Sequence, residues 1–163
     1  MRIAIPQEDE NLKKELITYQ REDGVQLSGT LYLPPDYDGG RVPVVMWAYP
    51  QEFVDADVAG QVTNSPYEFN RVSYWGPLPF LALGWAVLDD PKMPIVGKGE
   101  ALPNDNFCDQ LVSSAKAAVD TLVERGICDP ERVAIGGHSY GAFMVANLLA
   151  HCELFQTGIA RSG

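Results

Sequence analysis

Residues 132–148 read Arg-Val-Ala-Ile-Gly-Gly-His-Ser-Tyr-Gly-Ala-Phe-Met-Val-Ala-Asn-Leu, and this stretch decides the fold. It contains the pattern Gly-x-Ser-x-Gly, with Ser139 at its centre. The apolar residues around the pattern predict a strand over 132–137 and a helix over 140–151. A strand, a sharp turn with a serine at its tip and a following helix make up a nucleophile elbow, whose small flanking residues let strand and helix pass closely. We therefore expect Ser139 to lie at such an elbow.

An elbow would place Ser139 at the N-terminus of a helix, where backbone N–H groups favour negative charge. Its hydroxyl could then attack a carbonyl carbon and form an acyl-enzyme that water hydrolyses. The oxyanion formed in that attack needs hydrogen-bond donors, and the backbone N–H of Tyr140 is expected to be one. The pattern thus predicts acyl transfer, with an incidental serine in a glycine-rich turn as the alternative.

Apolar patterning on both sides of the elbow predicts an α/β fold. A hairpin turn at Asp23-Gly24 separates two strands, at 16–20 and 25–33, which predicts an antiparallel start to the sheet. Further strands are expected at 43–49, 85–90 and 157–162, helices at 77–83 and from 104 or 106 to 125, loops at 50–76 and 91–104, and a tight turn at 129–131. Strands and helices alternate in the second half, and this order implies a parallel sheet covered by helices.

Composition limits the partners. The 163 residues suit one domain, and they are 46% hydrophobic and 21% charged. Acidic residues outnumber basic ones by 22 to 12, which gives a net charge of −10. Nucleic acids and anionic membranes attract clustered Lys and Arg, so we expect neither as a partner. The sequence shows no apolar segment typical of a signal peptide or a membrane span, and we expect a cytoplasmic location by default.

The three cysteines, Cys108, Cys128 and Cys152, are far apart and lack the Cys-x-x-Cys spacing of zinc and redox sites. They are expected to be reduced thiols. We expect neither a metal nor a cofactor.

Several segments together resemble one known family. The segment Gly136–Met144 is similar to the nucleophile segment of the prolyl oligopeptidase family of serine peptidases, and it looks most like the glutamyl endopeptidase branch. The other similar segments are Leu31–Pro35, Met46–Pro50, Asp89–Gly97, Asn104–Phe107 and Gly158–Gly163. The resemblance runs in order from about residue 15 to residue 163.

The resemblance implies an α/β-hydrolase fold, with a mostly parallel, doubly wound sheet and an N-terminal antiparallel hairpin. It implies a catalytic domain that is preceded by a β-propeller and acts on peptides. It also implies that the side chain of Tyr49 supplies the second oxyanion donor. The domain assignment that follows is a polar lead-in at 1–14 and a partial catalytic domain at 15–163. Plant members of this branch are chloroplastic.

The sequence departs from the family where a base and an acid should follow the nucleophile. His151 and Glu153 are expected about 18 Å along the helix from Ser139, too far for proton transfer. His138 is adjacent in sequence, but neighbouring side chains at an elbow point in different directions. The expectation is a chain that ends before the catalytic Asp and His and lacks the last strands. It would be inactive alone, with the strand at 157–162 as an unpaired edge available for self-association.

Preference for glutamate would require a cation near the nucleophile. Arg161, near the carboxyl end of the last strand, is the candidate for binding a substrate carboxylate. The alternative for Arg161 is a structural ion pair with Asp89 or Asp90. Arg71 and Lys98, in the long loops, are weaker candidates.

Two further interpretations of function stay open. The elbow alone does not separate a peptidase from an esterase or another acyl hydrolase of the same fold. The missing histidine also leaves open a catalytically inactive fragment or a binding module.

Overall fold

The computed structural model describes residues 12–53, 56–61, 65, 67, 73, 75–97 and 102–163. The expected lead-in at 1–14 therefore lies mostly outside the described residues, and Lys14 already begins the first strand.

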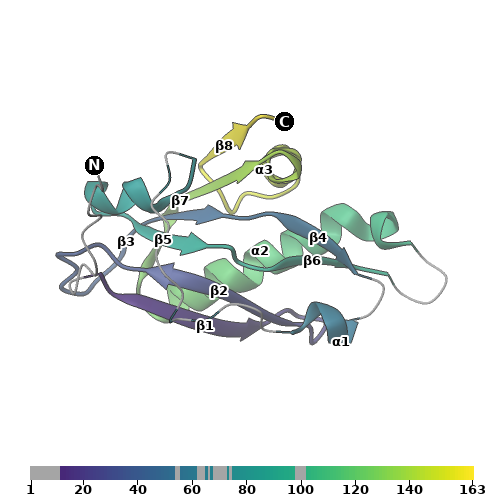
Figure 1. Cartoon of the computed structure of the whole chain (residues 1–163), viewed down its shortest axis with the longest axis horizontal. Coiled ribbons are helices and arrows are strands. Elements are labelled where there is room, and N and C mark those ends of the chain that lie inside the picture. Colours follow the sequence, from purple (N-terminus) through teal and green to yellow (C-terminus); the bar gives the residue numbers. More distant parts are fainter. Residues whose placement is uncertain are drawn as a thin grey trace, which may run out of the picture.

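A mixed six-stranded sheet forms the centre of the described fold, in the order β1-β2-β5-β3-β7-β8 (Figure 1). Its strands are β1 (Lys14–Gln20), β2 (Gln26–Tyr32), β3 (Val42–Trp47), β5 (Ala86–Asp89), β7 (Cys128–His138) and β8 (Thr157–Arg161). The first three strands in this order pair antiparallel, and the remaining pairs are parallel. The expected hairpin and parallel sheet are both present.

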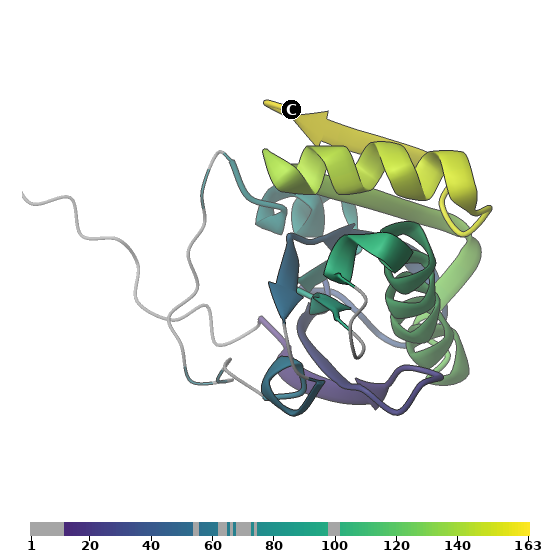
Figure 2. The same ribbon diagram turned by 90° about the vertical axis from the view of Figure 1, so that its right-hand side faces the viewer.

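Two helices cover one face of this sheet, α2 (Phe107–Glu124) and α3 (Tyr140–His151). Successive side chains of a strand point to opposite faces. Val44 and Met46 of β3 accordingly pack in the core cluster with both helices, whereas Val45 packs in a second cluster. The second cluster includes the 3₁₀ helix η1 (Leu78–Leu83), which covers the other face. Figure 2 shows α3 running alongside β8.

The two segments expected to be loops contain regular structure. β4 (Pro50–Phe53) and β6 (Met93–Val96) form a separate parallel pair, and short helices α1 (Ala56–Ala59) and η2 (Pro103–Asn106) lie nearby in sequence. The loop predictions for 50–76 and 91–104 were therefore wrong in part. Both strands are four residues long and contain a proline, a combination that favours loop assignment because proline donates no ladder hydrogen bond.

The tight turn expected at 129–131 lies inside β7. Val42 pairs with Cys128 and Val44 with Val133, so β7 holds extra residues between two pairs of the ladder. The Oδ1 of Asp129 accepts a hydrogen bond from the Glu131 N–H, at 3.1 Å, within this irregular segment. The turn is thus a bulge in a longer strand, and β7 starts before the expected residue 132.

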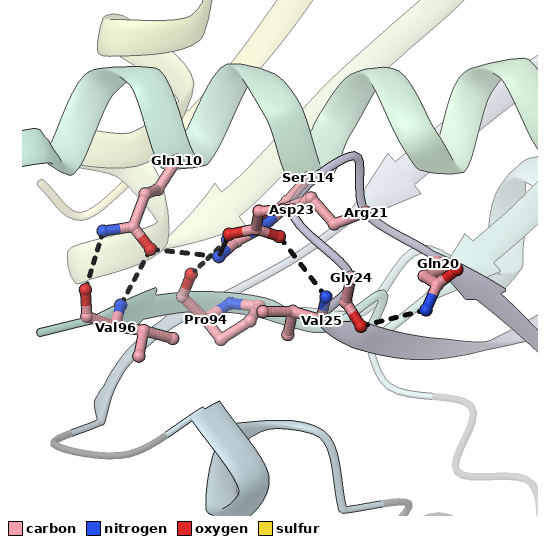
Figure 3. Close-up of polar contacts among 9 residues, drawn as sticks. All are labelled: Gln20, Arg21, Asp23, Gly24, Val25, Pro94, Val96, Gln110 and Ser114. Carbon is pink, nitrogen blue, oxygen red and sulfur yellow. Dashed lines mark hydrogen bonds and ion pairs between the residues drawn. The ribbon is translucent and has the colours of Figure 1, made fainter. Parts of the chain in front are cut away.

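A buried arginine ties the hairpin to the rest of the molecule (Figure 3). Arg21 is 2% exposed and holds the Asp23 carboxylate through Nε and Nη2, at 2.8 and 2.7 Å. Its Nη1 donates to the Pro94 carbonyl of β6 and to the Ser114 hydroxyl of α2, at 2.9 and 3.2 Å. Gln110 of α2 accepts from Arg21 and also bonds both backbone groups of Val96. Hairpin, β6 and α2 therefore share one polar network.

Within the described ranges, no helix is long and apolar enough to cross a membrane. The cysteines are free, as expected, and burial raises the pKa of the Cys128 thiol to about 11.

Candidate active site

Ser139 occupies a sharp turn between β7 and α3. β7 ends at His138 and α3 begins at Tyr140, so the strand–turn–helix arrangement expected around Ser139 is present. Ser139 has φ 56° and ψ −114°, a backbone conformation that residues with a Cβ rarely adopt. Such strain persists only where the surroundings impose it, and it concentrates at functional sites.

The surroundings impose it through two glycines. A Cβ on Gly137 would lie 2.6 Å from the carbonyl carbon and oxygen of Gly141, and a Cβ on Gly141 would lie 2.6 Å from the carbonyl oxygen of Ala48. Both distances are far below van der Waals contact. Strand β7, helix α3 and the end of β3 therefore meet at a separation that only glycine permits.

The backbone of Ser139 is fixed on both sides. Its N–H donates to the Arg161 carbonyl of β8 at 2.9 Å, and its carbonyl accepts from the N–H groups of Ala142 and Phe143. The residue is exposed, and within the described part of the chain its side chain makes no capping hydrogen bond to α3. The hydroxyl thus stands at the N-terminal end of a helix without being engaged by it.

The ring of Tyr140, the residue after Ser139, lies in an aromatic cluster. It stacks on Phe107 and Phe143, with ring centroids 5.8 and 6.0 Å away. Its hydroxyl donates to Oε1 of Glu52, on β4, at 3.1 Å. Partial burial, together with the hydrogen bond to Glu52, raises the pKa of Tyr140 to about 12. No local sequence pattern distinguishes Glu52, which only the fold brings to Tyr140.

Tyr49 lies at the carboxyl end of β3, the strand that pairs with β7. Its ring meets the Tyr140 ring edge-on, with centroids 5.9 Å apart and an interplanar angle of 78°. The side chain is 47% exposed. The structure therefore places Tyr49 beside Tyr140, the residue after Ser139. The resemblance implies an oxyanion donor at Tyr49. The donor role itself stays a prediction.

Arg161 ends β8 and is the register partner of His138. Its guanidinium carbon lies 3.6 Å from the centroid of the Trp75 ring, close enough for a cation–π contact. Asp90, one of its expected ion-pair partners, is bonded to Lys92 at 2.7 Å. Arg71 and Lys98 lie outside the described residues.

His151 and Glu153, the two residues considered as base and acid after Ser139, lie away from it. His151 is the last residue of α3 and lines a surface pocket with Cys108 and Lys116, away from Ser139. At 1.5 Å per residue it lies about 18 Å along the helix axis from Ser139. Glu153, which follows it, is exposed. Among the described residues, no group of three or more His, Cys, Asp and Glu side chains could hold a metal ion.

Comparisons with known proteins agree with the arrangement. Residues 104–163 match the sequence model of the "Prolyl oligopeptidase family". A rice protein named "Probable glutamyl endopeptidase, chloroplastic" is 54% identical over 157 residues, which cover 94% of this chain and 17% of the rice protein. An Arabidopsis thaliana protein of the same name is also 54% identical, over 94% of this chain and 16% of its own length. The chain thus spans a small part of these relatives.

Solved structures share the fold. The apo AtxE2 isopeptidase, a protein of Asticcacaulis excentricus, superposes with a TM-score of 0.67 at 25% identity, over 90% of this chain and 22% of that chain. A post-proline cleaving enzyme from Rickettsia typhi gives a TM-score of 0.66 at 22% identity, over 99% of this chain and 22% of that one. These structures confirm the α/β-hydrolase fold, and the sequence matches confirm the resemblance to the prolyl oligopeptidase family.

Proposed function

From this resemblance to the prolyl oligopeptidase family, we propose that the chain carries the nucleophile of a serine peptidase and that Ser139 attacks the peptide bond. The observation that carries the proposal is the strained backbone of Ser139 at the start of α3, enclosed by two glycines that admit no side chain. That geometry serves a side chain that must project from a turn. It has no evident purpose in a connection that only links strand to helix.

In the proposed reaction, the Ser139 oxygen bonds to the carbonyl carbon of the substrate and gives up its proton to a base. The tetrahedral oxyanion accepts hydrogen bonds from the Tyr140 N–H and the Tyr49 hydroxyl, and the positive end of the α3 dipole favours its charge. Collapse of this intermediate expels the amine with a proton and leaves the acyl group on Ser139. Water then hydrolyses the ester.

The base is proposed to come from outside the described residues. His151 and Glu153 lie at the far end of α3, and His138 precedes the nucleophile on an exposed strand end. This placement favours a second reading for the isolated 163-residue chain: it adopts the catalytic fold but turns over no substrate.

The finer proposal concerns substrate choice. Arg161 carries a guanidinium at the carboxyl end of β8. The Ser139 N–H donates a hydrogen bond to the backbone carbonyl of Arg161. A glutamate side chain next to the scissile bond would meet a positive charge there. The net charge of −10 disfavours nucleic acid and anionic membranes as partners. The plant relatives are named chloroplastic, and a cytoplasmic location for this chain stays a prediction.

A hybrid protein tests the proposal directly. In it, residues 12–163 replace the matching segment of the rice relative, which supplies the rest of a complete protein. We expect a fluorophosphonate probe to label the hybrid at Ser139 and a Ser139→Ala hybrid to stay unlabelled. We expect weak or no labelling of the isolated chain. A folded hybrid that is not labelled would refute the nucleophile, and one that cleaves esters but no peptide would favour an acyl hydrolase.

Substrate choice is tested in the same hybrid. Arg161→Met is expected to reduce kcat/KM for a peptide with glutamate before the cleaved bond by tenfold or more, while a matched glutamine peptide changes little. An equal effect on both peptides would remove Arg161 from specificity and leave the nucleophile assignment intact.

A further inference from the structure

Glu52 is an exposed residue on β4 that belongs to no motif. Its carboxylate nevertheless accepts a hydrogen bond from the hydroxyl of Tyr140, the residue after Ser139. We propose that Glu52 is a positioning residue of the oxyanion site: it fixes the Tyr140 ring and, through that ring, orients the Tyr49 phenol. The inference rests on the proposed function, because Tyr49 is an oxyanion donor only within it.

The Tyr140 ring is restrained from several directions. Phe107 of α2 and Phe143 of α3 stack on it at interplanar angles of 28° and 16°, and Glu52 holds its hydroxyl at 3.1 Å. Phe107, Phe143 and Glu52 come from three different elements. Contacts from three elements therefore restrain the orientation of the Tyr140 ring.

Tyr49 depends on that ring. A half-exposed tyrosine keeps rotamer freedom unless a neighbour restrains it. The Tyr49 ring packs edge-on against the Tyr140 ring, 5.9 Å between centroids, a geometry that aromatic quadrupoles favour. A rotation of the Tyr140 ring would remove this contact and free the Tyr49 hydroxyl to move. An oxyanion donor has to lie about 2.7–3.1 Å from the developing charge, so a small displacement removes its effect.

The carboxylate suits this task better than a neutral acceptor. A hydrogen bond from a phenol to a carboxylate is charge-assisted and stronger than a neutral one. Burial and Glu52 both raise the pKa of Tyr140, to about 12, so the phenol stays protonated and keeps donating at neutral pH. Glu52 lies on β4, just after the connection from β3 that carries Tyr49, so one short segment contacts Tyr140 with both side chains.

Kinetics of the hybrid protein test the inference. Glu52→Ala and Tyr140→Phe each remove the hydrogen bond, and each is expected to lower kcat about tenfold with KM changed less than twofold. The double variant is expected to lose no more than either single one, because both changes break the same contact. Glu52→Gln keeps an acceptor and is expected to restore kcat to within about threefold. The matched control is Glu124→Ala, an exposed glutamate at the far end of α2.

Two kinetic outcomes would overturn it. Additive losses would show that Glu52 and Tyr140 act separately. A change in KM alone would show that Glu52 contacts the substrate instead of positioning Tyr49.

A spectroscopic measurement on the 163-residue chain separates this inference from the proposed function. With ¹³C-labelled tyrosine, the Tyr140 Cζ signal can be assigned by its loss in Tyr140→Phe. We expect this signal to titrate with a pKa of about 12, and we expect that pKa to be lower in Glu52→Gln. The Tyr49 signal is expected to move in Glu52→Ala and stay in place in Glu52→Gln. An unlabelled hybrid would refute the proposed function. Unchanged tyrosine signals would refute the role of Glu52, whatever the hybrid does.

Discussion

At the scale of single residues, the position of Ser139 depends on two neighbours that have no side chain. The carbonyl oxygen of Ala48 and the backbone of Gly141 occupy the space that a Cβ would need at 141 and 137. The positive φ of Ser139 is thereby maintained by the packing of β3, β7 and α3. The two glycines of the motif are a direct requirement of this packing, which explains why their spacing around the serine predicts the elbow.

Replacement of Gly141 by alanine should therefore act on the elbow. The added methyl group would press on the Ala48 carbonyl at 2.6 Å, and we expect the free energy of unfolding to fall by about 1–3 kcal/mol. Probe labelling of Ser139 in the hybrid should be lost at the same time. Gly76→Ala is the matched control, because within the described part of the chain its Cβ would meet no atom nearer than 3.7 Å. Urea unfolding of both variants decides the question, and equal stability of the two would contradict the steric account.

Asp89, at the end of β5, gives the stability a pH dependence. Burial, and then the neighbouring charge of Asp90, raises its pKa from 3.8 to about 6, and Lys14 partly offsets this. The folded state thus binds a proton more tightly than the unfolded state does. The stability that protonated Asp89 contributes is complete below about pH 4 and is lost as the pH rises toward 6 and beyond.

Asp89→Asn should remove this dependence. At about pH 7.5 we expect the variant to be more stable than the parent by about 1–2 kcal/mol, since no charge is buried. At about pH 4 the two proteins should differ little. Urea titrations at the two pH values measure this, and a variant that is less stable at the higher pH would show that the ionised carboxylate is needed.

At the scale of elements, the strands of the central sheet were predictable and the β4–β6 pair was not. The central strands are apolar segments bounded by turn residues, and their patterns agree with their burial. β4 and β6 each contain a proline. They pair with each other, Pro50 with Met93, although about forty residues of sequence separate them. No local pattern encodes such a pairing. Glu52 and Trp75 were missed for the same reason, because only tertiary structure brings them to Tyr140 and Arg161.

The Arg21 network should be the main polar link between these elements. Arg21→Met would leave the Pro94 carbonyl and the Ser114 hydroxyl without their buried donor, and we expect a loss of about 3 kcal/mol in unfolding free energy. Arg21→Lys should recover little, since an ammonium cannot reproduce the forked guanidinium contacts. Arg132→Met, which removes an exposed ion pair with Asp129, should lower the unfolding free energy far less than Arg21→Met does. A comparable loss in both methionine variants would mean that burial of Arg21 adds nothing.

At the scale of the whole molecule, the resemblance predicted the fold. The residues proposed for the site, Ser139, Tyr140 and Tyr49, lie in contiguous motifs, and the structure brings the Tyr49 and Tyr140 rings together, while their roles stay predictions. The resemblance predicted neither the aromatic support of Tyr140 nor the stacking of Arg161 on Trp75. The domain assignment at 15–163 stays a prediction. In the described fold, β8 is a sheet edge with β7 as its neighbour, and its residues are half-buried or exposed.

We therefore predict that the 163-residue chain self-associates through β8. Unpaired N–H and C=O groups of an edge strand can pair with the same strand of a second copy. Sedimentation velocity over a concentration series should show oligomers that Ile159→Lys disperses, because a charge on an edge strand opposes such pairing. Leu83→Lys, at an exposed apolar residue of η1, should leave the oligomers in place. A parent chain that stays monomeric throughout the series would remove the prediction.

The elbow also determines which parts of its motif can change independently. Gly137 and Gly141 are required by the backbone alone, whereas the Ser139 hydroxyl is engaged by no cap of α3. A homologous sequence that keeps both glycines but has lost the serine would then be an inert copy of the same scaffold. Ser139→Ala should accordingly leave the packing of β3, β7 and α3 intact, and under the proposed function the hybrid that carries it should bind peptides without cleaving them. In sequence surveys, the glycines would identify the architecture, and the serine would separate enzymes from pseudoenzymes.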